Sequence, residues 1–534
     1  MSRRLLLIAS CILMIVSCKP KVSSELEQKV NSYALCKIGS PVKEESITDR
    51  GKEVLNLFRN AADEVDRIYW DQTFGNREAI DSLPEGAAKQ YAFINYGPWD
   101  RVDDNKPFIE GYGKKPLGAN YYPADMTKEE WDAFDDPAKL SPYTLIRRDS
   151  TGKLKAVWYH DAYKESVDKI ATILQSAAAI TIKPSVRNYL LKRAEALKTD
   201  DYRESDMAWM DMKDSKMDLV IGPIEDYDDQ LNGIKTAYEC FVLLKDLKKT
   251  EMLSKYISML PDLQKTLPCD STYKTFVPGT ESDMFVYDAI YYAGNCNAGS
   301  KTIAINLPND PEIQAQKGTR RLQLQNVMKA KFDMIVLPIG KILIEPEQQK
   351  YLSDLAFFWD VTFHEVAHGL GVKETVNGLG SVSDALGIQN STWEEAKADI
   401  VGLYLVCELI EKGEIPILTK EDAITTYIAS LVRSVRFGSG DAHGKANMMC
   451  YNYLKDHKAF TRNEKGLYHI DYAAAPKVIA DWANLILTVQ ATGNYMYADE
   501  YCANHAVVSE ALLADLANVN RADVPVDLRF DFVR

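Results

Sequence analysis

The sequence predicts an α+β protein that is mostly helical. Before about residue 335, strand-like apolar runs alternate with helical segments, and after it apolar residues recur at helical spacing almost throughout. The chain has 534 residues, which is long for one compact core, so we expect more than one lobe. Its residues are 46% hydrophobic and 26% charged, a globular composition.

The N-terminus has the pattern of an export signal. Arg3 and Arg4 precede an apolar run over residues 5–16, which is too short to span a bilayer. The run ends in "IVSC", which resembles a bacterial lipobox and implies cleavage before Cys18 and a lipid on its thiol. We therefore expect a lipid-anchored protein of the bacterial cell envelope, in the periplasm or on the outer-membrane surface. The alternative is an ordinary signal peptide that is cut nearby.

The predicted elements follow in order along the chain. We expect helices at 50–68, 162–200 and 249–265, short strands and loops over 75–160, a strand in "MDLVIGPI", a strand–loop–strand unit over 301–337, and helices over 345–412 and 420–515. No repeat of fixed period and no second apolar run of membrane length is visible in the sequence.

Charge and cysteine content exclude several classes of protein. The net charge of -14 argues against a nucleic-acid partner. The nine cysteines include no C-x-x-C pair, which indicates neither a cysteine zinc site nor a dense disulfide framework. Cys269 and Cys296 lie in loop-like sequence and could pair.

The segment "TFHEVAHGLG" carries two histidines four residues apart. Positions i and i+4 share one face of a helix, so His364 and His368 can bind one metal ion. Glu365 is rotated by about 100° and would stand beside the metal, where it could act as a general base. The alternative is an ordinary helix, because this short match can arise by chance. A catalytic zinc needs a third protein ligand.

The segment "STWEEAKADIVGLYLV" supplies a candidate for that ligand. Glu395 and Asp399 share one face of a partly buried helix, where acidic groups need a partner. We expect Glu395 to be the third ligand, and Glu394 and Asp399 to accept hydrogen bonds from the second nitrogens of the histidines. A solvated acidic first turn would explain the two glutamates but not Asp399.

"HEVAH" followed about thirty residues later by "EEAKAD" resembles the dipeptidyl peptidase III family of zinc metallopeptidases. The best-known members have one more residue between the histidines. The shorter spacing is similar to plant relatives that are fused to a Nudix domain, although no Nudix signature is present here. Three further segments resemble the family in its order: "IGPIEDYDDQLNGIKTAYECFV", "INLPND" and "RFGSGDAHGKAN".

The resemblance implies one Zn²⁺ and five further site residues. Tyr227 and His443 would stabilise the oxyanion, while Glu225, Asn306 and Asn309 would bind the free α-amino group of a short peptide. Each has a simpler interpretation as a packed tyrosine, a surface histidine or a turn residue. Where familiar members have an arginine for the carboxylate end of the peptide, this chain has Asn447, with Lys445 nearby.

The resemblance also implies two lobes with a wide cleft: a helical upper lobe that holds zinc, and a mixed lower lobe with a small β-barrel. The expected segments are a signal peptide (1–17), a tether (18–45), the lower lobe (46–245 and 289–335), the upper lobe (246–288 and 336–515) and a return to the lower lobe (516–534). We expect a monomeric peptidase that releases dipeptides. The alternatives are a zinc hydrolase of a non-peptide or modified amide substrate, and a catalytically weak peptide-binding lipoprotein.

Overall fold

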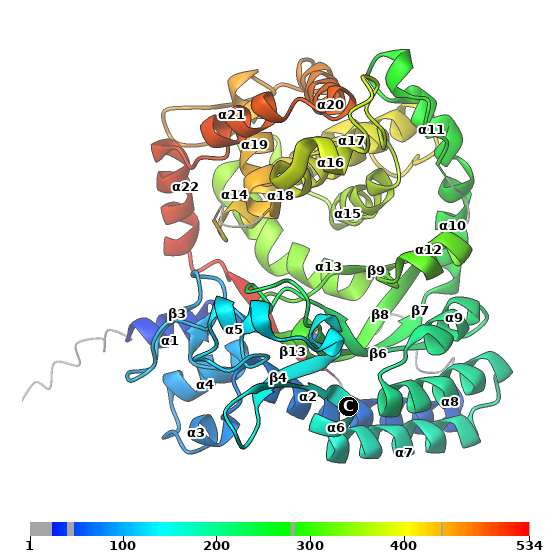
Figure 1. The fold of residues 1–534 in the computed structure, drawn as a ribbon. Helices are drawn as coiled ribbons and strands as arrows, with labels where there is room; N and C mark the ends of the chain where they lie inside the picture. The colour runs from blue at the N-terminus through cyan, green and yellow to red at the C-terminus, as the bar shows by residue number, and fades with distance from the viewer. Residues whose placement is uncertain (1–23, 40–46, 279–282, 439–441, 533–534) are drawn as a thin grey trace, which may run out of the picture.

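The structure is a computed structural model of the chain. It describes residues 24–39, 47–278, 283–438 and 442–532 (Figure 1). The predicted signal peptide and Cys18 lie outside these residues. Within them, no helix combines the length and the apolar character that crossing a membrane requires.

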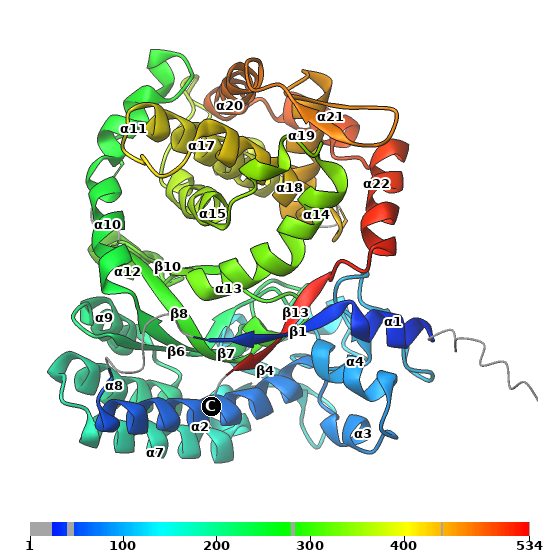
Figure 2. The ribbon, with the colours of Figure 1, turned by 180° about the vertical axis from the view of Figure 1, so that it is seen from behind.

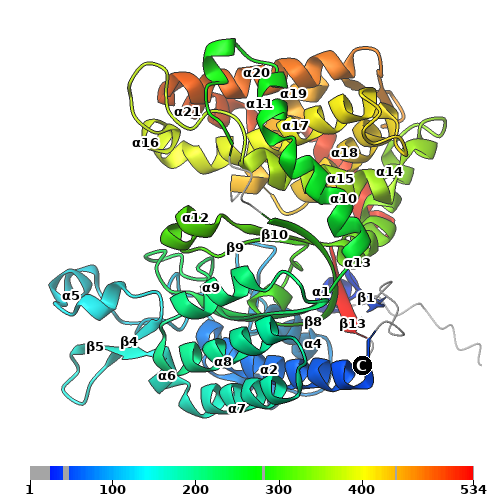
Figure 3. The ribbon, with the colours of Figure 1, turned by 90° about the vertical axis from the view of Figure 1, so that its right-hand side faces the viewer.

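Two large hydrophobic cores divide the molecule into an upper and a lower lobe (Figures 1, 2 and 3). The upper core is built almost entirely from helices, and the lower core from a sheet and the helices that cover it. The predicted two-lobed, mostly helical α+β fold is confirmed. The residue limits given above for the segments of each lobe stay a prediction.

A curled five-stranded sheet forms the centre of the lower lobe. Its strands, in spatial order, are β6 (Met217–Glu225), β7 (Ala237–Lys245), β8 (Asp283–Gly294), β10 (Arg320–Leu324) and β9 (Ala304–Leu307). Neighbours are antiparallel except β8 and β10, which are parallel. The sheet is open between β6 and β9, so the small barrel expected here is a half-barrel.

Helices cover the face of this sheet that points away from the upper lobe (Figure 1). The main ones are α2 (Asp49–Thr73), α7 (Lys164–Ile180), α8 (Pro184–Thr199) and α9 (Arg203–Asp211). The smaller elements of this part are α1 (Glu25–Asn31), β1 (Tyr33–Ile38), α3 (Arg77–Asp81), α4 (Ala87–Asn95), β2 (Trp99–Asp100), β3 (Lys106–Pro107), α5 (Lys128–Ala133), β4 (Thr144–Arg148), β5 (Leu154–Trp158), α6 (Tyr159–Ala162) and α12 (Pro311–Lys317).

The upper lobe is a bundle of helices around α15 and α17. Its elements are α10 (Leu247–Ser258), α11 (Leu260–Thr266), α13 (Gln325–Lys331), α14 (Leu337–Leu343), α15 (Asp354–His368), α16 (Val382–Leu386), α17 (Asn390–Glu411), α18 (Lys420–Val435), α19 (Ala442–Asp456), β11 (Phe460–Arg462), β12 (Tyr468–Ile470), α20 (Ala475–Thr492), α21 (Tyr495–His505) and α22 (Glu510–Arg521). The chain then descends to β13 (Asp527–Phe532), which pairs in parallel with β1 (Figure 2).

Two expectations are wrong. The predicted strand–loop–strand unit becomes helical from Gln325, since α13 and a π-helical turn (Phe332–Val336) follow β10 directly. Buried apolar residues fill this segment because it connects the two cores, and a short buried helix has the same apolar density as a strand. Cys269 and Cys296 are both free thiols; the first packs on the upper core and the second belongs to the lower one.

The zinc-motif helix α15 packs unusually closely against α17. Its first turn is capped by the Ser353 hydroxyl, which accepts a hydrogen bond from the Ala356 amide. A Cβ atom added at Gly402 of α17 would lie 2.8 Å from the backbone nitrogen of His364 and 3.0 Å from the carbonyl oxygen of Phe363. Only a glycine allows the two backbones to approach this closely at the first histidine of the motif.

We predict that Gly402→Ala destabilises the protein. Glycine to alanine inside a helix normally stabilises by about 1 kcal/mol. Here the methyl group meets backbone, so the free energy of unfolding should fall by about 1–3 kcal/mol, as measured by urea denaturation. Gly113→Ala is the control, because no atom lies within 4 Å of the added Cβ. A Gly402→Ala variant more stable than the wild type would contradict the close packing.

Candidate metal centre and active site

Three potential metal ligands converge between α15 and α17. The Nε2 atoms of His364 and His368 are 3.2 Å apart. The Glu395 Oε2 atom lies 3.3 Å from the first and 3.8 Å from the second. Among the residues that the structure describes, these three form the one group of histidine, cysteine or acidic side chains with ligand atoms close enough for a shared metal ion.

Two further carboxylates of α17 hold the opposite sides of the imidazole rings. Asp399 Oδ1 is 2.7 Å from His364 Nδ1, and Glu394 Oε1 is 3.0 Å from His368 Nδ1. A carboxylate on Nδ1 favours the tautomer in which Nδ1 carries the proton and Nε2 carries a lone pair. In their neutral, metal-binding form, both rings would therefore direct an Nε2 lone pair into the same space.

The electrostatics of this space favour a cation. Burial raises the pKa of Glu395, but the hydrogen bond and charge of His364 outweigh this and lower it to about 2. Burial lowers the pKa of His364, but Asp399 and Glu395 raise it well above its usual range. Three anionic groups thus surround the two imidazoles, and a divalent ion would balance them.

The geometry fits zinc. Ligand atoms at about 2.0–2.1 Å from a tetrahedral zinc ion are about 3.3 Å apart, and the separations here are 3.2, 3.3 and 3.8 Å. Two imidazole nitrogens, whose rings are held by outer carboxylates, and one carboxylate oxygen are the donor set of a catalytic zinc site, which keeps its fourth position open.

Glu365 follows the first histidine of the cluster in sequence, and His443 lies beside the cluster in space. Glu365 is half-buried on α15, directly after the first histidine. His443 is in the first turn of α19, and its Nε2 lies 3.2 Å from Glu395 Oε2, although its side chain is 67% exposed. An exposed imidazole beside the cluster can reach a bound molecule, which a packed histidine could not. The Asn447 amide donates to the His443 carbonyl oxygen at 2.7 Å, one helical turn away.

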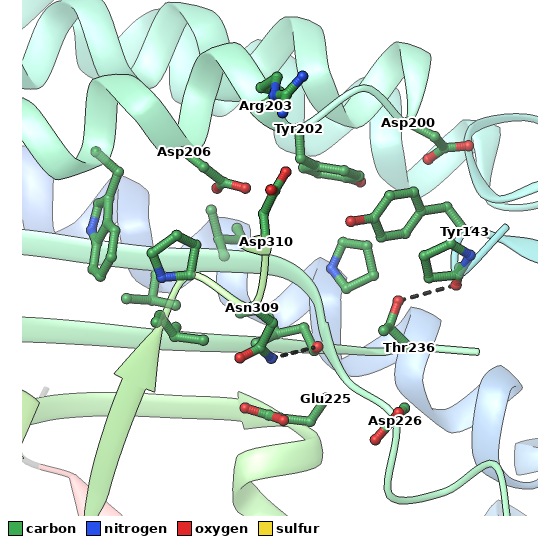
Figure 4. Close-up of a pocket in the computed structure, with 18 of the residues that line it drawn as sticks. Tyr143, Asp200, Tyr202, Arg203, Asp206, Glu225, Asp226, Thr236, Asn309 and Asp310 are labelled. Atoms are coloured by element: carbon green, nitrogen blue, oxygen red, sulfur yellow. Dashed lines mark hydrogen bonds between the residues drawn. The ribbon is translucent and has the colours of Figure 1, made fainter. Parts of the chain in front are cut away.

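The residues predicted to bind the amine lie in the lower lobe. Glu225, Tyr227 and Asn309 line a cavity of about 900 Å³ (Figure 4). Asn309 Nδ2 donates to the carbonyl oxygen of Ile224 at 3.3 Å. Tyr227 is 71% exposed, so it is not a packed core residue. Asn306 is not among the lining residues; it lies exposed on β9.

The acidic residues at this cavity also suit an amine ligand. Burial raises the pKa of Glu225, although hydrogen bonding from Asn309 opposes the rise. Glu239 of β7 is buried beside it, and its pKa is raised well above the usual range by burial and by the charge of Glu225. Two acids in a poorly hydrated place can share an ammonium ion.

Sequence reasoning missed several residues of the site. Lys397 Nζ is fully buried and donates to Glu394 Oε1 at 2.7 Å and to the Leu370 carbonyl oxygen at 3.0 Å. Gln490 of α20 donates to Glu394 Oε2 at 3.2 Å. The sequence could have indicated Lys397, because it lies three residues after Glu394, on the same face of a helix whose neighbouring residues are apolar. Gln490 and Glu239 come from distant segments without a local signal.

Comparison with known proteins decides the family. A profile of the family described as peptidase family M49 matches residues 139–378. The structure of DPP III from Caldithrix abyssi matches this one with a TM-score of 0.91 and 35% sequence identity, covering 95% of this chain and 98% of that chain. The chain belongs to peptidase family M49. This confirms the resemblance to dipeptidyl peptidase III.

Two further relatives support this placement in family M49. DPP III from Corallococcus sp. strain EGB has a TM-score of 0.82 and 32% identity, covering 95% of this chain and 96% of that one. Nudix hydrolase 3 from Arabidopsis thaliana is 31% identical over 95% of this chain and 73% of its own length. Members of family M49 are zinc metallopeptidases, and the histidine–glutamate cluster lies where such an ion would bind.

We predict that Asp399→Asn and Glu394→Gln each lower zinc affinity by about 10–100-fold, because each weakens the hydrogen bond that orients a ligating imidazole. Competition with a chelating dye measures this. Glu408→Gln on the same helix is the control, since Glu408 pairs only at the surface with Lys412, at 3.4 Å. Equal zinc affinity in all variants would show that these carboxylates do not support the metal.

Proposed function

We propose that the protein is a zinc-dependent dipeptidyl peptidase that releases dipeptides from the N-termini of short peptides. The observation that carries this is the convergence of His364, His368 and Glu395 in a chain of peptidase family M49. These residues would hold the zinc ion. When bound, the ion polarises the scissile carbonyl and makes a water molecule more acidic.

The residues of the chain supply proton transfer and charge stabilisation. Glu365 stands one position from the first ligand, so its carboxylate can take a proton from the water and then give it to the leaving amine. His443, exposed beside Glu395, would donate to an oxygen that becomes negative. Tyr227 would join it from the lower lobe, which requires that the lobes approach each other when substrate binds.

The lower-lobe residues would set the length of the product. Glu225 and Asn309 line one cavity, and a buried second acid, Glu239, lies close enough for its charge state to depend on that of Glu225. A free α-amino group carries the complementary charge, and with Asn306 on β9 these residues would fix the first residue of a peptide. The second peptide bond would then lie at the metal. Family membership favours this activity over a non-peptide amide hydrolase or a weak peptide-binding lipoprotein.

We also propose that the mature protein is anchored through a lipid on Cys18 to a membrane of the bacterial cell envelope. The support is the sequence alone, in which a charged start and a short apolar run precede a lipobox-like "IVSC". Residues 19–24 would then separate the peptidase from the membrane, because α1 begins at Glu25 and β1 pairs with β13 of the folded protein. Metabolic labelling with a fatty-acid analogue, lost in Cys18→Ser, tests this; equal labelling of the variant would refute it.

We predict that purified wild-type protein loaded with zinc releases N-terminal dipeptides from a peptide library, and that Glu365→Gln does not. The amide cannot take a proton from water, so kcat should fall by at least about 100-fold. The zinc content of the variant should equal that of the wild type, because Glu365 is not a ligand. Release of dipeptides at an undiminished rate by Glu365→Gln would remove its role as a base.

We predict that N-acetylation of a substrate peptide abolishes its cleavage. Acetylation removes the positive charge that Glu225 and Asn309 would bind, and leaves buried acids unpaired. Mass spectrometry of acetylated and free forms of one peptide measures the difference. Glu225→Gln should raise KM for the free peptide, and this variant should discriminate less between the two forms. Cleavage of the acetylated peptide at the same bond and rate would contradict recognition of the amine.

A further inference from the structure

Arg321 lies in β10 of the lower lobe, next to β9, and its side chain reaches α15, the helix that carries the zinc motif. In β10 it is the direct cross-strand partner of Asn306 on β9. Directly paired residues project from the same face of a sheet. Asn306 is exposed on that face, whereas Arg321 is only 6% exposed. Figure 3 shows β9 and β10 at the upper edge of the lower lobe, beneath the helices of the zinc lobe.

The guanidinium of Arg321 lies against the last turn of α15. A Cβ atom added at Gly369 would lie 3.2 Å from its Nη2 atom. Gly369 follows Glu365 by four residues, so the two share one face of the helix. Arg321 therefore reaches the face of the zinc helix that carries the proposed general base.

This buried cation lacks the partners that buried arginines normally have. Its Nε and Nη1 atoms are buried and have no hydrogen-bond partner. The adjacent Arg320 also has a buried Nε without a partner, but its other nitrogens pair with Asp218 at 3.2 Å and donate to the Trp209 carbonyl oxygen at 2.6 Å. A buried guanidinium with two unpaired nitrogens costs stability, so its presence in the folded protein needs an explanation.

Glu365 is the acid that acts on this cation. Burial lowers the pKa of Arg321, and the negative charge of Glu365 opposes that shift. The two groups come from different lobes, one from the strand beside Asn306 and the other from the metal helix. A small approach of the lobes would bring the unpaired N–H groups to the carboxylate.

We propose that Arg321 is a positioning residue that orients the Glu365 carboxylate for proton transfer. Because Arg321 lies beside β9, it would fix the position of the general base on α15 relative to a peptide bound at β9. This inference rests on the proposed function, because it assigns a task to Arg321 only if Glu365 acts as a base. Arg321 would then support the reaction although it lies outside the zinc motif.

The test uses three variants of the full chain loaded with zinc. Arg321→Met keeps most of the buried volume without the charge, and Arg321→Ala leaves space for an added guanidinium ion. Gln323→Leu is the matched control, since Gln323 lies two residues further on the same face of β10, is fully buried and also has side-chain atoms without partners. Dipeptide release gives kcat and KM, chelator competition gives zinc affinity, and thermal melting reports folding.

We expect kcat of Arg321→Met and Arg321→Ala to fall by about 10–100-fold, with KM within about twofold of the wild type. Zinc affinity should not change, and Gln323→Leu should behave as the wild type. Guanidinium at non-denaturing concentration should restore part of kcat in Arg321→Ala, while urea, its neutral analogue, and NaCl at equal ionic strength should not.

Three results would overturn the inference. The first is an unchanged kcat in both Arg321 variants. The second is a higher KM with unchanged kcat, which would make Arg321 a substrate-binding residue, and the third is a loss of zinc affinity, which would make Arg321 a residue that supports the metal. If Arg321→Ala does not fold, the values for Arg321→Met decide. A wild-type enzyme that binds zinc but releases no dipeptides would instead refute the proposed function.

Discussion

The site depends on how closely α15 and α17 approach. Gly402 lets the backbone of one helix touch the backbone of the other at the first histidine of the motif. At this separation Glu395, two turns earlier on α17, and Asp399, one turn earlier, reach opposite sides of the His364 ring. A wider spacing would still leave two helices with the same residues, but the ligand atoms would no longer meet at about 3.3 Å from one another.

The close approach concentrates negative charge, and the rest of the bundle compensates for it. Three acids of α17 face two imidazoles, and Lys397 is buried beneath Glu394 to balance part of that charge. The histidines alone do not balance the remainder, which a divalent ion would. Metal binding and helix packing are therefore coupled, because the same ion that could activate a water would also relieve repulsion in the interface between the helices.

The sequence predicts well those parts of the site that lie within a single helix. Residues four apart on one helix must share a face, so His364 and His368 follow from spacing, as does the common face of Glu395 and Asp399. Contacts between segments do not follow in this way. Gln490 and Arg321 reach the site from α20 and β10, and no periodicity indicates which distant strand or helix will lie against the motif. The helical segment after β10 was missed for a related reason, since burial between two cores removes the polar face that distinguishes helix from strand.

The metal cluster lies in the upper lobe, and the residues proposed to bind the amine lie in the lower lobe. The proposed reaction requires one zinc ion between α15 and α17. The most direct test is anomalous X-ray diffraction from zinc-containing crystals, measured on both sides of the zinc absorption edge. We predict one peak, within about 2.0–2.2 Å of His364 Nε2, His368 Nε2 and a Glu395 carboxylate oxygen. A peak elsewhere, or one that touches the histidines but not Glu395, would contradict it.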